Sequence, residues 1–104
     1  MFARLVSVRL KSNMVSDYTH KFEAEILPLL RKQKGFKDEI SLSNPGSPDA
    51  IAISLWENKA DAEAYNTTTY PTVLKIVQGM IEGTPKVQTF EVVTSTLHKV
   101  PVAA

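Results

Sequence analysis

The segment from Ile51 to Tyr65 constrains the fold more than any other part of the chain. A short, mostly apolar run ends at Trp56, the only tryptophan, and a helical pattern follows at once. Asn58 and Asp61 have the spacing of an acidic capping box, which satisfies free backbone N–H groups in the first turn of a helix. The segment therefore predicts a strand that leads directly into a capped helix.

The strand predicted from Asp49 to Glu57 has two dissimilar faces. One face is bulky and consists of Ile51, Ile53 and Leu55. The other is built from small residues and closed by an indole, and consists of Ala50, Ala52, Ser54 and Trp56. Small side chains leave space that helix residues or a ligand must fill. The pattern alone leaves open which of the two faces meets the helices.

The first third of the chain predicts a strand followed by a helix. Alternation covers Phe2 to Lys11, and Ser12-Asn13 offer a cap for the helical pattern that follows. We expect Pro28 to kink this helix, because its ring clashes with the carbonyl four residues earlier. Gly35 is expected to end the helix in a left-handed conformation.

The remaining elements complete a six-element order. A turn-rich sequence at 44–48 joins the strand at 36–43 to the strand of Trp56, so that the two pair in an antiparallel hairpin. The second helix is interrupted near 66–69, where threonines disfavour helix, and is expected to stop at Gly83. A final strand is expected from Pro85 to about His98.

The order strand, helix, strand, strand, helix, strand is that of a ferredoxin-like α+β fold with a four-stranded antiparallel sheet. We expect residues 1–104 to form this single domain. Helices should cover one face of the sheet. Several strands carry apolar residues on both sides, so the second face is expected to pack against another copy of the chain in a homodimer.

Composition narrows the possible functions. Cysteine is absent among the 104 residues, which excludes disulfides, thiol nucleophiles and cysteine metal sites. The net charge is +1 and the basic residues form no stripe, so no nucleic-acid partner is expected. No apolar run reaches the roughly 20 residues of a membrane span. We therefore expect a soluble, cytoplasmic protein with no membrane partner.

The chain resembles the antibiotic biosynthesis monooxygenase (ABM) family in Gly35-Phe36, in Ser54-Leu-Trp56-Glu57, in the helix that carries Tyr65, and in the order of its elements. The resemblance implies a dimeric α/β barrel, with two sheets back to back and the helices outside. It also implies a small-molecule cavity. Members of the family include cofactor-independent oxygenases of quinols or polyketide aromatics, heme-degrading oxygenases, and proteins without an assigned role.

The heme-degrading branch of that family is not favoured. Alignment on Trp56-Glu57 puts Tyr65 where that branch has a tryptophan, and Lys75 where it has the iron-ligating histidine. A lysine ammonium has no free lone pair at neutral pH. Val8 falls near the position of the branch's asparagine in the first strand. All three positions depart from the pattern.

Candidate site residues gather around the small-residue face. We predict a pocket inside each protomer, between that face and the helix from Asn58 to Tyr70, with Ala52, Ser54 and Trp56 contacting the ligand. Tyr65 and Tyr70 flank the weak helical segment and are candidate catalytic groups, because their hydroxyls can orient a phenolic or quinone oxygen. Simple packing of both rings is the alternative for them, as it is for Trp56.

Two further candidates come from the predicted strands. His98 is expected on one face of the last strand with Phe90, either as a catalytic base or as a hydrogen-bonded residue at a sheet or subunit boundary. Asp38 is expected to share a face with Phe36, either as a buried acid in the ligand site or as an edge residue. Phe36 and Asp38 are therefore included among the ligand-binding candidates.

The favoured function is a cofactor-independent monooxygenase of the ABM type that acts on a quinol or polyaromatic substrate. Two distant histidines make no recognisable metal site, and no glycine-rich phosphate loop or nucleophile elbow is present. We therefore expect neither a cofactor nor a metal. The alternative is a module on the same barrel that binds a small ligand, or serves in a stress response, without catalysis.

Overall fold

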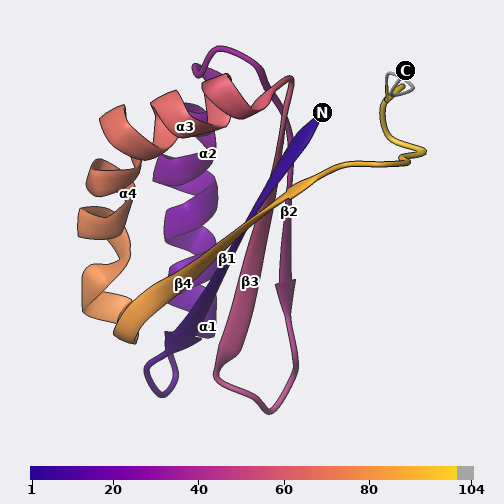
Figure 1. Ribbon diagram of the computed structural model, residues 1–104. Coiled ribbons are helices and arrows are strands. Elements are labelled where there is room, and N and C mark those ends of the chain that lie inside the picture. The colour runs from indigo at the N-terminus through magenta and orange to yellow at the C-terminus, as the bar shows by residue number, and fades with distance from the viewer. Residues whose placement is uncertain (101–104) are drawn as a thin grey trace.

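The computed structural model describes residues 1–100 as a two-layer structure, with an antiparallel sheet covered on one face by helices (Figure 1). The sheet has four strands in the order β2-β3-β1-β4. The strands are β1 (Phe2–Leu10), β2 (Phe36–Ser43), β3 (Asp49–Trp56) and β4 (Ile81–Glu91). The helical segments are α1 (Val15–Lys21), the π-helix η1 (Phe22–Ile26), α2 (Leu27–Arg31), α3 (Lys59–Thr68), α4 (Tyr70–Val77) and the 3-10 turn η2 (Gln78–Met80). The ferredoxin-like α+β fold expected from the sequence is confirmed.

The register of the central strands determines which side chains face the helices. In the β1–β3 pair, Phe2 lies opposite Trp56 and Val8 lies opposite Ala50, and all four side chains are buried in the core under the helices. Side chains alternate along a strand. The small-residue face of β3 therefore meets the helices, and its bulky face lies on the other side of the sheet.

A bulge in β2 changes the face on which its residues lie. Phe36 pairs with Trp56 but Asp38 pairs with Leu55, so one extra residue interrupts the alternation. Phe36 therefore lies on the helix-covered side, with its ring 5.6 Å from that of Trp56 in an edge-to-face arrangement. Asp38 lies on the opposite, open face. The expectation that Phe36 and Asp38 share a face is wrong.

The first helical stretch accommodates Pro28 through a change in its hydrogen-bond pattern. The N–H of Leu27 bonds to the carbonyl of Phe22, five residues earlier, which makes η1 a wide π-turn that ends two residues before Pro28. Pro28 then stands in the first turn of α2, where its missing N–H is tolerated. The start of the stretch also differs from expectation. Met14 occupies the cap position of α1 without a side-chain hydrogen bond, and Asn13 has a positive φ of 62°.

The second helical stretch follows the expected pattern until its end. The side chain of Asn58 accepts a hydrogen bond from the N–H of Asp61 at 2.9 Å, and the helix breaks at Thr69 between α3 and α4. The prediction that Gly83 stops this stretch is wrong. Gly83 lies inside β4 with a φ of 69°, beside a register shift in the β1–β4 pair. β4 begins earlier and ends earlier than expected, at Glu91.

Gly35 joins the helices to the sheet. Its φ of 78° lies in the left-handed region, and a Cβ there would collide with the carboxylate of Asp61 in α3. Its carbonyl accepts a hydrogen bond from the N–H of Glu57 at 2.7 Å. A glycine is required here both for the backbone conformation and for the close approach of α3.

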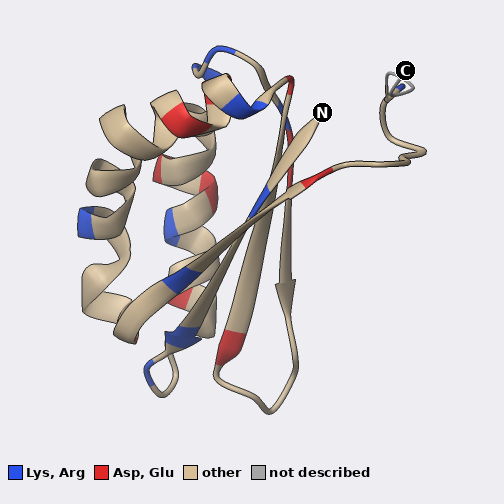
Figure 2. Ribbon diagram, viewed as in Figure 1, with Lys and Arg blue, Asp and Glu red and all other residues tan. Residues whose placement is uncertain are grey.

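The face of the sheet away from the helices is open among the described residues. It presents large apolar side chains to solvent, with Ile40 41 %, Leu42 49 % and Phe90 51 % exposed. Acidic and basic residues are interspersed over both layers (Figure 2). No helix within residues 1–100 is both long and apolar enough to cross a membrane.

Candidate functional site

A cavity lies between the sheet and the helical layer. Its volume is about 40 Å³. All four strands contribute to its walls, together with α1, η1, α2, α3 and α4. The apolar part of the wall consists of Val6, Val8, Phe22, Ile26, Leu30, Ala52, Val73, Leu74, Val77 and Pro85, and the polar part of Arg4, Tyr18, Glu39, Ser54, Tyr65 and Tyr70. A mostly apolar wall with a few polar groups is typical of small-molecule sites.

Arg4 is the most unusual side chain in this wall. It projects from the middle of the sheet and is only 3 % exposed. Its Nη2 donates to Oδ1 of Asn66 at 2.8 Å, and its guanidinium carbon lies 4.0 Å from the ring centroid of Tyr70 and 5.2 Å from that of Tyr65. Within residues 1–100 no carboxylate forms an ion pair with it. A buried cation held by an amide and two aromatic faces retains an unneutralised charge.

Tyr65 and Tyr70 line the cavity, with their rings 6.2 Å apart. Burial raises the pKa of Tyr65 to about 12, against the opposing positive charge of Arg4, and burial likewise raises the pKa of Tyr70. Both hydroxyls therefore stay protonated at neutral pH and act as hydrogen-bond donors. The hydroxyl of Tyr70 is buried and is the one such side-chain atom without a partner in the described chain.

Trp56 packs behind the cavity wall, against Tyr65 and Ser54. It is 0 % exposed, its ring centroid lies 5.0 Å from that of Tyr65, and its Nε1 donates to Oγ of Ser54 at 2.8 Å. Ser54 in turn is 3.4 Å from the carbonyl of Arg4, to which it donates. Trp56 is not part of the cavity wall and neither is Phe36, which packs against it. Both support the wall residues Ser54 and Tyr65.

Glu39 reaches the same cavity from the edge strand β2. It pairs with Ser54 across β2 and β3, and Ser54 pairs with Arg4 across β3 and β1. A polar row therefore crosses the helix-covered face of the sheet from Glu39 through Ser54 to Arg4. Burial raises the pKa of Glu39, and a hydrogen bond from Oγ of Ser41 at 2.7 Å opposes this effect.

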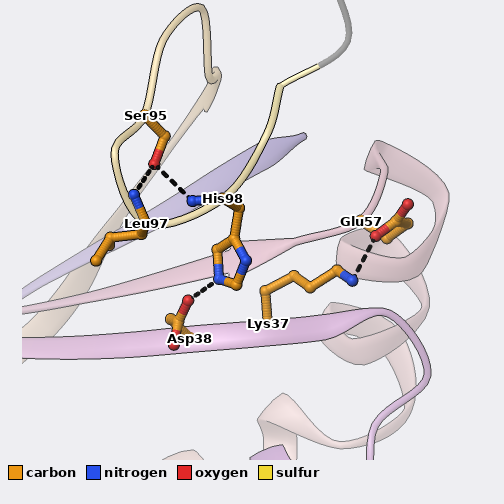
Figure 3. A network of polar contacts seen from close by, with 6 residues as sticks. All are labelled: Lys37, Asp38, Glu57, Ser95, Leu97 and His98. Carbon is orange, nitrogen blue, oxygen red and sulfur yellow. Dashed lines mark hydrogen bonds and ion pairs between the residues drawn. The ribbon is translucent and has the colours of Figure 1, made fainter.

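His98 and Asp38 lie outside the cavity. His98 follows β4 in an irregular segment, not in a strand as expected, and its Nε2 contacts Oδ2 of Asp38 on the open face (Figure 3). Oγ of Ser95 accepts hydrogen bonds from the backbone N–H groups of Leu97 and His98, which shapes the turn that presents the imidazole. Figure 3 also shows the neighbouring surface ion pair of Lys37 and Glu57, at 2.8 Å.

The structure thus brings together Ala52, Ser54, Tyr65 and Tyr70, and separates them from His98 and Asp38. Sequence reasoning missed Arg4, Glu39, Tyr18 and Asn66. A signal existed for Arg4, since it interrupts the otherwise apolar face of Phe2, Val8 and Leu10. The bulge in β2 concealed Glu39, because strict alternation puts it on the wrong face. Within residues 1–100, no group of three or more acidic or histidine side chains is arranged to hold a metal ion.

Solved structures share this fold over almost the whole chain. NE2512, a protein of unknown function from Nitrosomonas europaea, has a TM-score of 0.75 at 17 % identity, covering 98 % of this chain and 95 % of its own. SnoaB, a cofactor-independent oxygenase from Streptomyces nogalater, has a TM-score of 0.75 at 10 % identity, covering 93 % and 97 %. An antibiotic biosynthesis monooxygenase has a TM-score of 0.72 at 12 % identity, covering 90 % and 100 %.

By sequence, no protein-family profile and no curated protein matches the chain. The likeness is therefore one of three-dimensional structure. The chain has the fold of the antibiotic biosynthesis monooxygenases, and the expected resemblance to that family is confirmed at this level.

Proposed function

We propose that the protein is a cofactor-independent monooxygenase that acts on a hydroxylated aromatic, such as a quinol or polyaromatic, in the cavity under α3 and α4. The observation that carries this proposal is Arg4, a buried cation without a described ion pair in an otherwise apolar cavity. Such a charge favours a ligand that carries or develops negative charge. An ionised electron-rich aromatic is also the form that reacts directly with oxygen.

Some wall residues would orient the ligand, and others would stabilise the negative charge that develops on it. Arg4 would hold the oxygen that becomes negative, and the unpartnered hydroxyl of Tyr70 would donate a hydrogen bond to it. Tyr65 would pack against the ring while Ala52 leaves room beneath it. In this proposal the tyrosines are donors, because their raised pKa values oppose the role of bases.

A second hollow also borders Arg4 and would give a ligand access to it. It lies between α3 and β4, holds about 140 Å³, and shares Arg4 with the main cavity. Asn66 and Thr89 are also part of its wall. A ligand in this hollow would lie beside the hydrogen bond between Arg4 and Asn66.

Oxygen uptake tests this function. Quinols and hydroxylated polyaromatics are supplied to the wild-type protein and to Arg4→Met, with Arg9→Met as the matched control. Arg9 lies on the same strand but is exposed and pairs with Glu82 at 3.4 Å. We expect uptake above the uncatalysed rate for wild type and Arg9→Met, and at least about a hundredfold loss for Arg4→Met, as for removal of one group that stabilises an oxyanion. Equal rates with and without wild-type protein for all substrates contradict the proposal.

The size of the cavity favours a second candidate, binding without turnover. The cavity holds only about 40 Å³, so a polycyclic substrate requires α3 and α4 to move apart. A small phenol or carboxylate requires less movement of these helices. Saturable ligand binding without oxygen consumption, measured by quenching of Trp56 fluorescence, would favour this module over the oxygenase.

We also propose that a second copy of the chain covers the open face of the sheet, which gives the dimeric barrel. Ile40, Leu42 and Phe90 supply an apolar surface that a soluble monomer rarely leaves exposed. Sedimentation of wild type, Phe90→Lys and the control Val93→Lys tests this. Val93 is 84 % exposed and lies beyond β4. We expect only Phe90→Lys to shift the mass toward a monomer, and a monomeric wild type at micromolar concentration rules the dimer out.

A further inference from the structure

The polar row across the sheet places opposite charges at its two ends. Arg4 on β1 and Glu39 on β2 are separated by β3, and both line the cavity. Neighbouring strands are about 4.8 Å apart, so the two backbones are separated by roughly 10 Å. The width of one aromatic ring with its substituents fits that span. No ion pair joins the two side chains within the described residues.

The residue between them is already engaged. Oγ of Ser54 accepts from Trp56 and donates to the carbonyl of Arg4. The other titratable groups in the wall are the tyrosines, which burial keeps protonated. His98 and Asp38 lie on the other side of the sheet. Glu39 is therefore the one carboxylate in this wall, and burial raises its pKa.

We propose that Glu39 and Arg4 act together on an acidic hydroxyl of the ligand, with Glu39 accepting its proton and Arg4 holding the resulting oxyanion. The O–H bond of a bound phenol or enol breaks, its proton forms a bond to a carboxylate oxygen of Glu39, and the electron pair stays on the ligand oxygen beside Arg4. No oxidant is needed for this step, and the complex keeps its total number of protons. The inference rests on the proposed ligand site and names its ligand class as phenols and enols rather than apolar hydrocarbons or ethers.

Burial of Glu39 supports this role. Its side chain is half-buried, and burial raises its pKa, which makes the carboxylate a better proton acceptor than an exposed one. The charged and titratable groups that share the cavity with it are Arg4, Tyr18, Tyr65 and Tyr70. None of these is a competing acid at neutral pH, because three are high-pKa phenols and one is a permanent cation.

Binding of 4-nitrophenol tests the inference without turnover. Its phenolate absorbs visibly and its phenol form does not, and 4-nitroanisole, which has no acidic proton, is the matched control probe. Both are titrated into the protein about one pH unit below the solution pKa of the phenol, with calorimetry in two buffers to count protons released. For wild type we expect a bound phenolate with no proton released to the buffer. For Glu39→Gln we expect about a tenfold smaller ratio of phenolate to phenol at that pH.

The remaining outcomes separate this inference from the proposed function. Arg4→Lys should retain part of the phenolate signal and Arg4→Met should lose it, while both variants still bind 4-nitroanisole. If wild type binds 4-nitroanisole and 4-nitrophenol but shows no phenolate, the proton transfer is refuted and the ligand site stands. Release of one proton by wild type, as by Glu39→Gln, also refutes the role of Glu39. Failure of both probes to bind overturns the site and this inference together.

Discussion

The hydroxyl of Tyr70 should cost the unliganded protein stability. It is buried and makes no hydrogen bond of ordinary geometry in the described chain, and the guanidinium carbon of Arg4 lies 4.0 Å from the centroid of its ring. A buried polar group without a partner costs about 1–3 kcal/mol. Tyr70→Phe removes the oxygen and keeps both the ring and its contact with Arg4. Some of the gain is lost to the small void that the oxygen leaves, so we expect a net stabilisation of about 1 kcal/mol.

Urea unfolding followed by Trp56 fluorescence measures this change. Trp56 is the only tryptophan and is 0 % exposed, so its emission reports on loss of the core. A gain of about 1 kcal/mol corresponds to a rise in Tm of roughly 4–8 °C for a domain of this size. The m-value should not change, since the variant exposes the same surface on unfolding.

Tyr18→Phe is the matched control, because it makes the same chemical change in the same cavity wall. The Tyr18 hydroxyl is not a buried atom without a partner, so we expect no gain in stability there. If Tyr70→Phe is less stable than wild type, or if the two variants change stability equally, the Tyr70 hydroxyl has a partner in the folded protein. The account of it as a donor held free for a ligand is then refuted.

Three further predictions concern single residues. Burial raises the pKa of Glu39, so the folded state binds more protons than the unfolded state between the ordinary and the raised value. Stability therefore falls as pH rises through that window, and the advantage of Glu39→Gln over wild type in urea unfolding should grow with pH there and then level off; a constant difference contradicts this. Gly35→Ala should cost about 1–2 kcal/mol for the left-handed backbone plus the collision with Asp61, whereas Gly46→Ala, with a φ of 84° and open space around it, should cost the backbone part alone; equal losses would exclude the collision. Asn58→Ala should lower stability by about 1 kcal/mol, because it removes the cap of α3, and an unchanged urea midpoint would mean that the cap contributes nothing.

Much of the fold was predictable because its signals are local. The Asn58 cap, the turn-rich loop and the break near Thr69 each depend on a few adjacent residues, and the structure places all three where expected. The errors arose where backbone irregularity interrupts a regular period. The bulge before Asp38 inverts part of β2, and Gly83 serves a register shift inside β4 rather than a helix end.

The site was less predictable than the fold. Tyr65 and Tyr70 were found because they flank a visible break in the helix. Arg4 and Glu39 lie on separate strands, and they approach one another only when β3 pairs with both β1 and β2. His98 was assigned to the strand because alternation continues past Glu91, although the ladder itself ends there. A local sequence pattern does not show which residues from distant parts of the chain lie close together in the sheet.

The polar row also bears on how the chain selects its own strand pairing. A slip of one residue in β1 would turn Arg4 to the open face and carry Phe2, Val8 and Leu10 out of the core with it. Arg4 would then lose Asn66 and both aromatic rings. A sheet with β1 out of register would thus lose stability for two reasons: less apolar surface is buried, and the charged side chain of Arg4 loses its contacts. Arg4, which we propose binds the ligand, therefore also favours the native register of β1, because only that register preserves its contacts.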